Sequence, residues 1–197
     1  MLAAVPPIAV LAASSAAIIG LTALGVVQRT VRPAWSAANL DSEVSVGMWF
    51  SAALLWTTAA VWAVVAAARH TTGWAWAWSA VVTLLALDEG NAVHERLERW
   101  SGVDWQLLYL PVLAAGAIAW WFLLRALPAR PARPVLAGAM AWGAALGLEL
   151  IQNWGGEPIR ASLYDPMMIA EEALEMAGAA LFLVGGLLIL RSTRRPV

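Results

Sequence analysis

Residues 167–190 read MMIAEEALEMAGAALFLVGGLLIL, a long apolar run interrupted near its start by Glu171, Glu172 and Glu175. A transmembrane helix needs about 20 mostly apolar residues, so this run predicts a helix that crosses a membrane. Carboxylates are costly inside a membrane, where they are rare and usually functional. The same stretch therefore predicts both the environment of the protein and the place of a functional site.

The composition of the whole chain supports a membrane location. Of its 197 residues, 61% are hydrophobic and 13% are charged, and the mean hydropathy is +0.71. A soluble domain is about 45–50% apolar and about 25% charged. The composition therefore excludes an ordinary cytosolic enzyme, a nucleic-acid-binding protein and a disordered chain, and it predicts a multi-pass membrane protein.

Five more apolar stretches precede residues 167–190 in the chain, and the loops between the stretches are short. The six predicted spans cover residues 5–27, 45–68, 73–95, 105–126, 134–154 and 167–190. Short loops between neighbouring helices are typical of a compact bundle. The sequence therefore predicts a single all-α transmembrane domain over residues 1–197.

The distribution of arginine predicts the orientation of the bundle. The basic residues within 125–133 and 191–195 have no acids beside them, and cytoplasmic loops carry an excess of basic residues. Both termini are therefore expected in the cytoplasm. Lysine is absent from the chain, a usage typical of GC-rich bacterial genomes, so we expect a multi-pass protein of a bacterial cytoplasmic membrane.

Several cofactors are excluded by residues that the chain lacks. It contains no cysteine, so an iron–sulfur cluster has no thiolate ligands. Without lysine there is no Schiff base for a retinal group. His70 and His94 are the two histidines, and they lie at opposite ends of a predicted span, so bis-histidine haem binding within one chain is not expected.

Carboxylates occur on three of the predicted spans at similar depths. With a rise of about 1.5 Å per residue, Asp88, Glu149 and Glu175 lie about 22, 21 and 22 Å from the inner ends of their spans. Glu172 lies about 27 Å from the same end. Because the hydrocarbon core is about 30 Å thick, three helices are expected to bring carboxylates together beneath the outer surface.

Local patterns predict how two of these spans are built. If residues 73–95 form one continuous helix, Asp88, Asn91 and Glu95 share one stripe of it. Asp165 followed by Pro166 reads as an N-cap with proline at the first helical position. The last helix is therefore expected to begin there.

Small and aromatic residues predict packing and anchoring. Gly143 and Gly147 form a GxxxG step, which favours close approach of another helix. The 13 tryptophans gather near the expected ends of the spans, including Trp105 at the outer end and Trp78 at the inner end. Tryptophan is enriched at membrane interfaces, so we expect these residues to anchor the bundle.

A bound cation explains the acids best. Carboxylates three and four residues apart on a helix repel one another, so they need protons, arginines or a cation. Carboxylates with one imidazole suit a divalent metal, with iron, manganese or calcium favoured over zinc. The expected metal ligands are Asp88, Glu149, Glu171, Glu172 and Glu175. His94 and Glu95 are expected to be catalytic, as ligands or as a general base.

The sequence thus predicts a metal site near the outer leaflet, used by a metal-dependent enzyme on a lipid-like or small apolar substrate. One alternative is a cation or proton transporter, because membrane acids also form proton relays. Another is an accessory subunit whose acids are paired with Arg96, Arg99 and Arg160. Membrane lipid is an expected partner, and a homo-oligomer or a larger membrane complex fits the composition, whereas nucleic acid does not.

Two runs carry a resemblance to known proteins. Residues 85–100, LALDEGNAVHERLERW, and 171–178, EEALEMAG, resemble patterns of uncharacterised bacterial multi-pass membrane proteins. That resemblance implies a membrane bundle and no assigned activity. Glu171 and Glu172 are also similar to the EExxxR motif of membrane-embedded CAAX-type proteases, but Met176 stands where that family has arginine, so protease chemistry is not implied.

Overall fold

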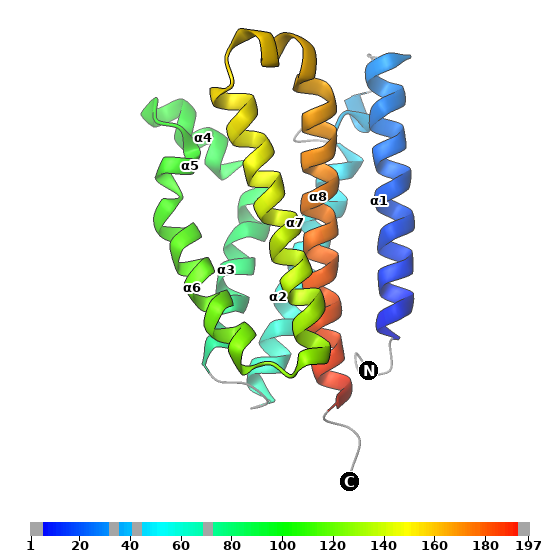
Figure 1. Ribbon diagram of the computed structural model, residues 1–197, viewed down its shortest axis with the longest axis vertical. Coiled ribbons are helices and arrows are strands. Elements are labelled where there is room, and N and C mark those ends of the chain that lie inside the picture. The colour runs from blue at the N-terminus through cyan, green and yellow to red at the C-terminus, as the bar shows by residue number, and fades with distance from the viewer. Residues whose placement is uncertain (1–5, 32–35, 41–44, 69–72, 193–197) are drawn as a thin grey trace.

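The computed structural model describes residues 6–31, 36–40, 45–68 and 73–192, and helices are the regular secondary structure found in these ranges. The long helices run roughly parallel or antiparallel to one another and form an elongated bundle (Figure 1). In chain order the elements are α1 (Pro7–Thr30), η2 (Ser36–Ala38), α2 (Val46–Ala67), α3 (Trp74–Glu89), α4 (Val93–Ser101), α5 (Trp105–Leu108), α6 (Leu110–Ala126), α7 (Ala129–Trp154) and α8 (Glu157–Ser192). The predicted all-helical bundle is confirmed.

Four helices in the described ranges are long and apolar enough to cross a membrane. They are α1, α2, α7 and the part of α8 from Ser162 to Ser192. The third and fourth predicted spans correspond to α3 and α6, which have 16 and 17 residues. At about 1.5 Å per residue these two helices are about 24 and 26 Å long, which is less than the thickness of the hydrocarbon core.

The third predicted span ends early because the chain turns after Glu89. Ala92 adopts a left-handed backbone conformation with φ 46°, and the Asp88 carboxylate accepts a hydrogen bond from the His94 backbone N–H at 2.8 Å. The chain then continues as the short polar helix α4. The prediction that Asp88, Asn91 and Glu95 share one helical stripe is therefore wrong.

The fourth predicted span is divided at Tyr109, which lies between α5 and α6. Pro111 occupies the first turn of α6. Proline has no N–H and clashes with the carbonyl four residues earlier, so a helix cannot pass through this position without distortion. The break turns α5 away from the axis of α6, towards α4 (Figure 1).

The last helix begins eight residues before the predicted cap. α8 starts at Glu157 and contains Pro166 in its interior, so the prediction that Asp165 caps this helix is wrong. The Asp165 carboxylate instead forms an ion pair with Arg29 of α1 at 3.3 Å. An acidic residue in the first turn, here Glu157, favours a helix start because it faces the positive end of the helix dipole.

α8 lies at the centre of the bundle and packs against α1, α2 and α7. The buried Trp62 indole of α2 donates a hydrogen bond to the Phe182 carbonyl of α8 at 3.0 Å. On the opposite side, α7 approaches α8 closely at Gly138 and Gly178: a Cβ atom on Gly178 would lie 3.0 Å from the Gly138 carbonyl oxygen. Glycine at both positions therefore allows the two helices to touch.

The predicted GxxxG step does not make a helix contact. A Cβ atom at Gly143 or Gly147 would meet nothing within 4 Å. Trp78 also differs from its predicted role as an anchor, because it is 5% exposed and packs edge-on against Phe182 in the core. Spacing along one helix cannot show which glycines face a partner helix.

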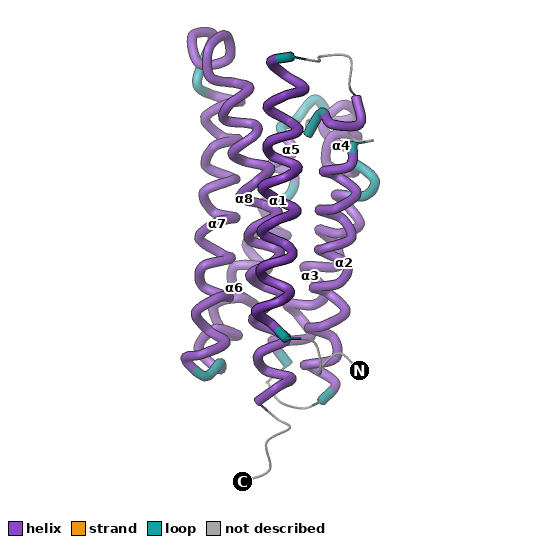
Figure 2. The backbone as a smooth tube through the Cα atoms, turned by 90° about the vertical axis from the view of Figure 1, so that its right-hand side faces the viewer, coloured by secondary structure: helices purple, strands orange, loops and turns teal. Residues whose placement is uncertain are grey.

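The two ends of the bundle differ in polarity. α1 begins and α8 ends at the same end, whereas α4 and α5 lie towards the other (Figure 2). The end with α4 and α5, called the cavity end below, holds the acids that the sequence singles out.

Candidate functional site

A cavity of about 160 Å³ lies at the cavity end, lined by residues of α2, α3, α4, α5, α6, α7 and α8. All of the acids predicted to form a site line it, together with the predicted histidine. We call it the acid cavity; its titratable lining residues are Asp88, Glu89, His94, Glu95, Glu149, Glu171, Glu172 and Glu175. The expected layer of carboxylates from three helices is therefore present, and α4 adds to it.

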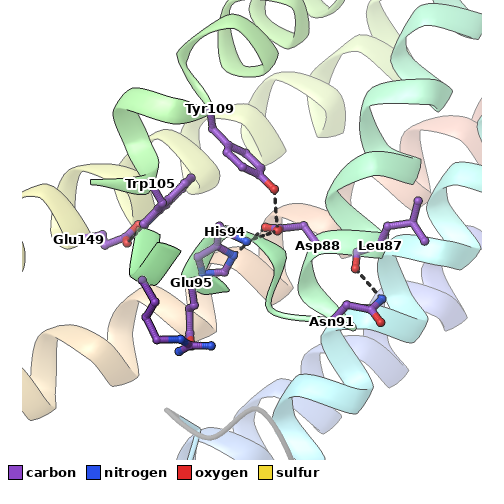
Figure 3. Close-up of polar contacts among 9 residues, drawn as sticks. Leu87, Asp88, Asn91, His94, Glu95, Trp105, Tyr109 and Glu149 are labelled. Atoms are coloured by element: carbon purple, nitrogen blue, oxygen red, sulfur yellow. Dashed lines mark hydrogen bonds and ion pairs between the residues drawn. The ribbon is translucent and has the colours of Figure 1, made fainter. Parts of the chain in front are cut away.

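Asp88 holds His94 in place. One Asp88 oxygen accepts hydrogen bonds from the His94 backbone N–H and from the Tyr109 hydroxyl, both at 2.8 Å. The other Asp88 oxygen lies 2.7 Å from His94 Nδ1 (Figure 3). With Nδ1 bound in this way, the other ring nitrogen of His94 is left for a ligand. Asp88 thus orients the imidazole, as carboxylates do for metal-bound or catalytic histidines.

The same contacts change the protonation of the histidine. Burial alone would lower the pKa of His94, but the hydrogen bond and the negative charge of Asp88, with smaller effects of Glu95 and Glu149, raise the pKa above its ordinary value. Burial and the bond to Asp88 also raise the pKa of the Tyr109 hydroxyl. Since the pKa of His94 is higher in the folded protein, the stabilisation from this pair is full below about pH 6.5 and is lost as the pH rises through the raised pKa.

Replacing Asp88 with asparagine is expected to lower the pKa of His94, because burial then acts with less opposing charge. The chain has two histidines, so the imidazole resonances can be followed in a pH titration by nuclear magnetic resonance and assigned with a His70→Gln variant. An unchanged His94 pKa in Asp88→Asn would show that Asp88 does not control this imidazole.

Trp105 is a site residue that the sequence analysis assigned to anchoring. Its indole N–H donates a hydrogen bond to Glu149 at 2.5 Å, and its ring lies 5.0 Å from the His94 ring and 5.6 Å from the Tyr109 ring. Figure 3 shows Trp105 beside Glu149, with His94 next to it. The break at Tyr109 brings Trp105 back over the cavity, and sequence periodicity gave no sign of this turn.

Glu95 lies at the mouth of the acid cavity. Its carboxylate accepts a hydrogen bond from Arg99 at 3.0 Å, and the two side chains are 42% and 62% exposed. Such an exposed pair one helical turn apart contributes little to stability. Of the arginines that could pair with the acids, Arg99 forms an ion pair with Glu95. The side chain of Arg160 lies outside the described residues.

The deeper acids come from α8 and α3. Gln152 of α7 donates a hydrogen bond to the Glu171 carboxylate. The Trp142 indole N–H donates to the backbone carbonyl of Glu175 at 2.9 Å, and both residues line the cavity. Glu89, Glu149, Glu171 and Glu172 line the same cavity as Glu175. Carboxylates that share this space repel one another when they are ionised.

A comparison with known families places the chain in one of them. The model of the domain of unknown function DUF8692 matches residues 2–190. The chain belongs to this family. No curated protein and no solved structure matches it. Because the family carries no assigned activity, the chemistry of the site has to be derived from its residues.

The metal prediction has no support in the geometry of the cavity. Among the described residues, no group of three or more histidines and acids is placed to hold a metal ion. Asp88 is engaged by three donor contacts from His94 and Tyr109, while Trp105 binds Glu149. The arrangement can hold a positive charge at longer range, take up protons, or use the free nitrogen of His94 as a base.

Proposed function

We propose that the protein binds a positively charged ligand in the acid cavity. Seven of the 13 acids of the chain line this space of about 160 Å³. The pairs Arg99–Glu95 and His94–Asp88 compensate two of them, and carboxylates that lie together in a low-dielectric site repel one another unless more compensation is present. A cation that enters the cavity supplies it, and the rings of Trp105 and Trp142 in the cavity wall attract cations to their faces.

The observation that carries the proposal is the surroundings of Glu175. Glu175 lines the cavity together with other glutamates, among them Glu89, Glu149, Glu171 and Glu172. An acid that only stabilised the bundle would be expected to face an arginine or a hydrogen-bond donor. We therefore infer that Glu175 is kept at this unfavourable position because it binds a positively charged ligand.

We further propose that the cavity end faces the outside of a bacterial cytoplasmic membrane, with both termini in the cytoplasm. The opposite end carries Arg125, Arg130, Arg133 and Arg191, which fits the cytoplasmic excess of basic residues. The chain has no Asp or Glu in residues 105–148 or after Glu175. A one-sided set of acids favours a binding site over a path across the membrane.

The proposal is tested by the thermal stability of the purified protein in the presence of cations. Ethylammonium, Ca²⁺ and Mn²⁺ are each titrated, with ethanol as the uncharged comparison. A ligand that binds the folded state at 100 times its Kd stabilises it by about 2.7 kcal/mol, so at least one cation is expected to raise the Tm saturably. Ethanol is expected to leave the Tm unchanged.

Matched variants locate the effect. Glu149→Gln removes a charge from the cavity wall, and Glu98→Gln removes one from the exposed face of α4, away from the cavity lining. The shift in Tm is expected to shrink in Glu149→Gln and to persist in Glu98→Gln. If no cation stabilises the protein, or if both variants respond alike, the proposed function is wrong.

A metal-dependent enzyme is the second candidate, and the Asp88–His94 pair favours it. A carboxylate bound to one histidine nitrogen commonly prepares the other nitrogen for a metal or for proton transfer. A metal would be iron, manganese or calcium, held by carboxylates that move inward together with His94. Elemental analysis of protein purified without chelator tests this second candidate. Stoichiometric metal in the wild type that is lost in Glu172→Gln would support a metal-dependent enzyme. Wild-type protein without bound metal would rule it out.

A further inference from the structure

An apolar groove of about 330 Å³ runs between α3, α6 and α7. It exists because α6 packs against α3 and scarcely touches α7, and because four glycine and alanine residues lie among the larger apolar side chains of its lining. Gly143 leaves particular room, since a Cβ atom there would meet nothing within 4 Å. The lining includes Val81, Gly116, Ala117, Ala139, Met140 and Gly143.

The groove adjoins the acid cavity. Leu85, Leu113, Trp142 and Leu146 line both spaces. Trp142 contacts both environments, because its ring packs edge-on against Phe182 while its indole N–H binds the Glu175 carbonyl. The apolar groove and the acid cavity thus share a wall.

The groove is long enough for a hydrocarbon chain. On α7 its lining extends from Leu136 to Leu146, a distance of about 15 Å at 1.5 Å per residue. Its volume lies near the lower end of the range for small-molecule sites, about 300–1,000 Å³. An extended chain can therefore lie along α7 with one end at the wall shared with the acid cavity.

We propose that the groove and the cavity are one binding site for an amphiphile with an ammonium headgroup and a hydrocarbon tail. This inference rests on the proposed function and names its ligand. The tail lies in the groove, and the headgroup lies among the carboxylates, to which its N–H groups donate hydrogen bonds. Ordinary phospholipids are disfavoured, because their phosphate would lie beside acids such as Glu149 and Glu175 and be repelled.

The test compares dodecylammonium, ethylammonium and dodecanol binding to the full chain by native mass spectrometry from nonionic detergent. Gly143→Phe fills the groove, and Gly20→Phe places the same side chain in equally open space on α1. Gly143→Phe is expected to weaken dodecylammonium binding about tenfold or more and to leave ethylammonium binding unchanged. Gly20→Phe is expected to affect neither.

Two results would overturn the inference and leave the proposed function standing. In the first, ethylammonium binds the wild type, and Gly143→Phe binds dodecylammonium as tightly as the wild type does. In the second, dodecanol binds the wild type as tightly as dodecylammonium does. Failure of both ammonium ions to bind the wild type would overturn the proposed function as well. If Gly143→Phe also loses ethylammonium, its fold is damaged. Met140→Trp, at a groove position that is 68% exposed, then provides the same comparison.

Discussion

Replacing Glu175 with glutamine is expected to abolish cation binding and, at the same time, to stabilise the empty protein. Glutamine keeps the shape of the side chain and removes the cost of either ionising or protonating an acid that shares the cavity with Glu89, Glu149, Glu171 and Glu172. Each kcal/mol of this cost that is removed raises the Tm by about 2–4 °C in a chain of this size. We expect a Tm several degrees above that of the wild type, together with the loss of the cation-induced shift.

The two effects distinguish a binding site from a structural network. If Glu175 were held by a stabilising partner, Glu175→Gln would lower the Tm, because the partner would be left unpaired in the interior. Glu98→Gln, on the exposed face of α4, controls for the change in net charge and is expected to leave the Tm within about 2 °C. A Tm that falls in Glu175→Gln would contradict our account.

The second large effect is expected where α7 and α8 touch. In Gly178→Ala the new Cβ atom would lie 2.2 Å from Trp142 Cδ1 and 3.0 Å from the Gly138 carbonyl oxygen. Overpacking of this kind costs about 1–3 kcal/mol. We expect the Tm to fall by several degrees, and cation binding to weaken because the displaced Trp142 lines the acid cavity.

Gly143→Ala is the matched control for this prediction. Its Cβ atom meets nothing within 4 Å, so alanine gains about 0.5–1 kcal/mol from its higher helix propensity. The Tm of Gly143→Ala is expected to equal or exceed that of the wild type. If the two variants change the Tm equally, the close approach of α7 and α8 at Gly178 is wrong.

The sequence predicts an all-helical bundle and the approximate place of its long helices, because apolar length is a strong signal. The predicted number of six spans is not confirmed, since four helices in the described ranges are long and apolar enough to cross a membrane. Counting residues along each helix also predicts that Asp88, Glu149 and Glu175 share a layer, and the three residues line one cavity. This inference needs only the rise of a helix, which is the same in every bundle.

Other features depend on tertiary contacts that periodicity does not encode. The turn before His94 depends on a bond from Asp88, and α8 runs through Pro166, although local preference indicates a helix start there. Trp105 joins the site because the chain folds back at Tyr109. The glycine that matters for packing is Gly178, which no spacing rule separates from Gly143.

The central claim is that the acid cavity binds a cation through carboxylates that cannot all be ionised when it is empty. Isothermal titration calorimetry of wild type and Glu175→Gln with ethylammonium, in two buffers that differ in ionisation enthalpy, tests it most directly. We predict saturable binding of one ligand per chain to the wild type with release of protons, and no saturable binding to Glu175→Gln. Absence of binding to the wild type, or equal binding and proton release in both proteins, would contradict the account.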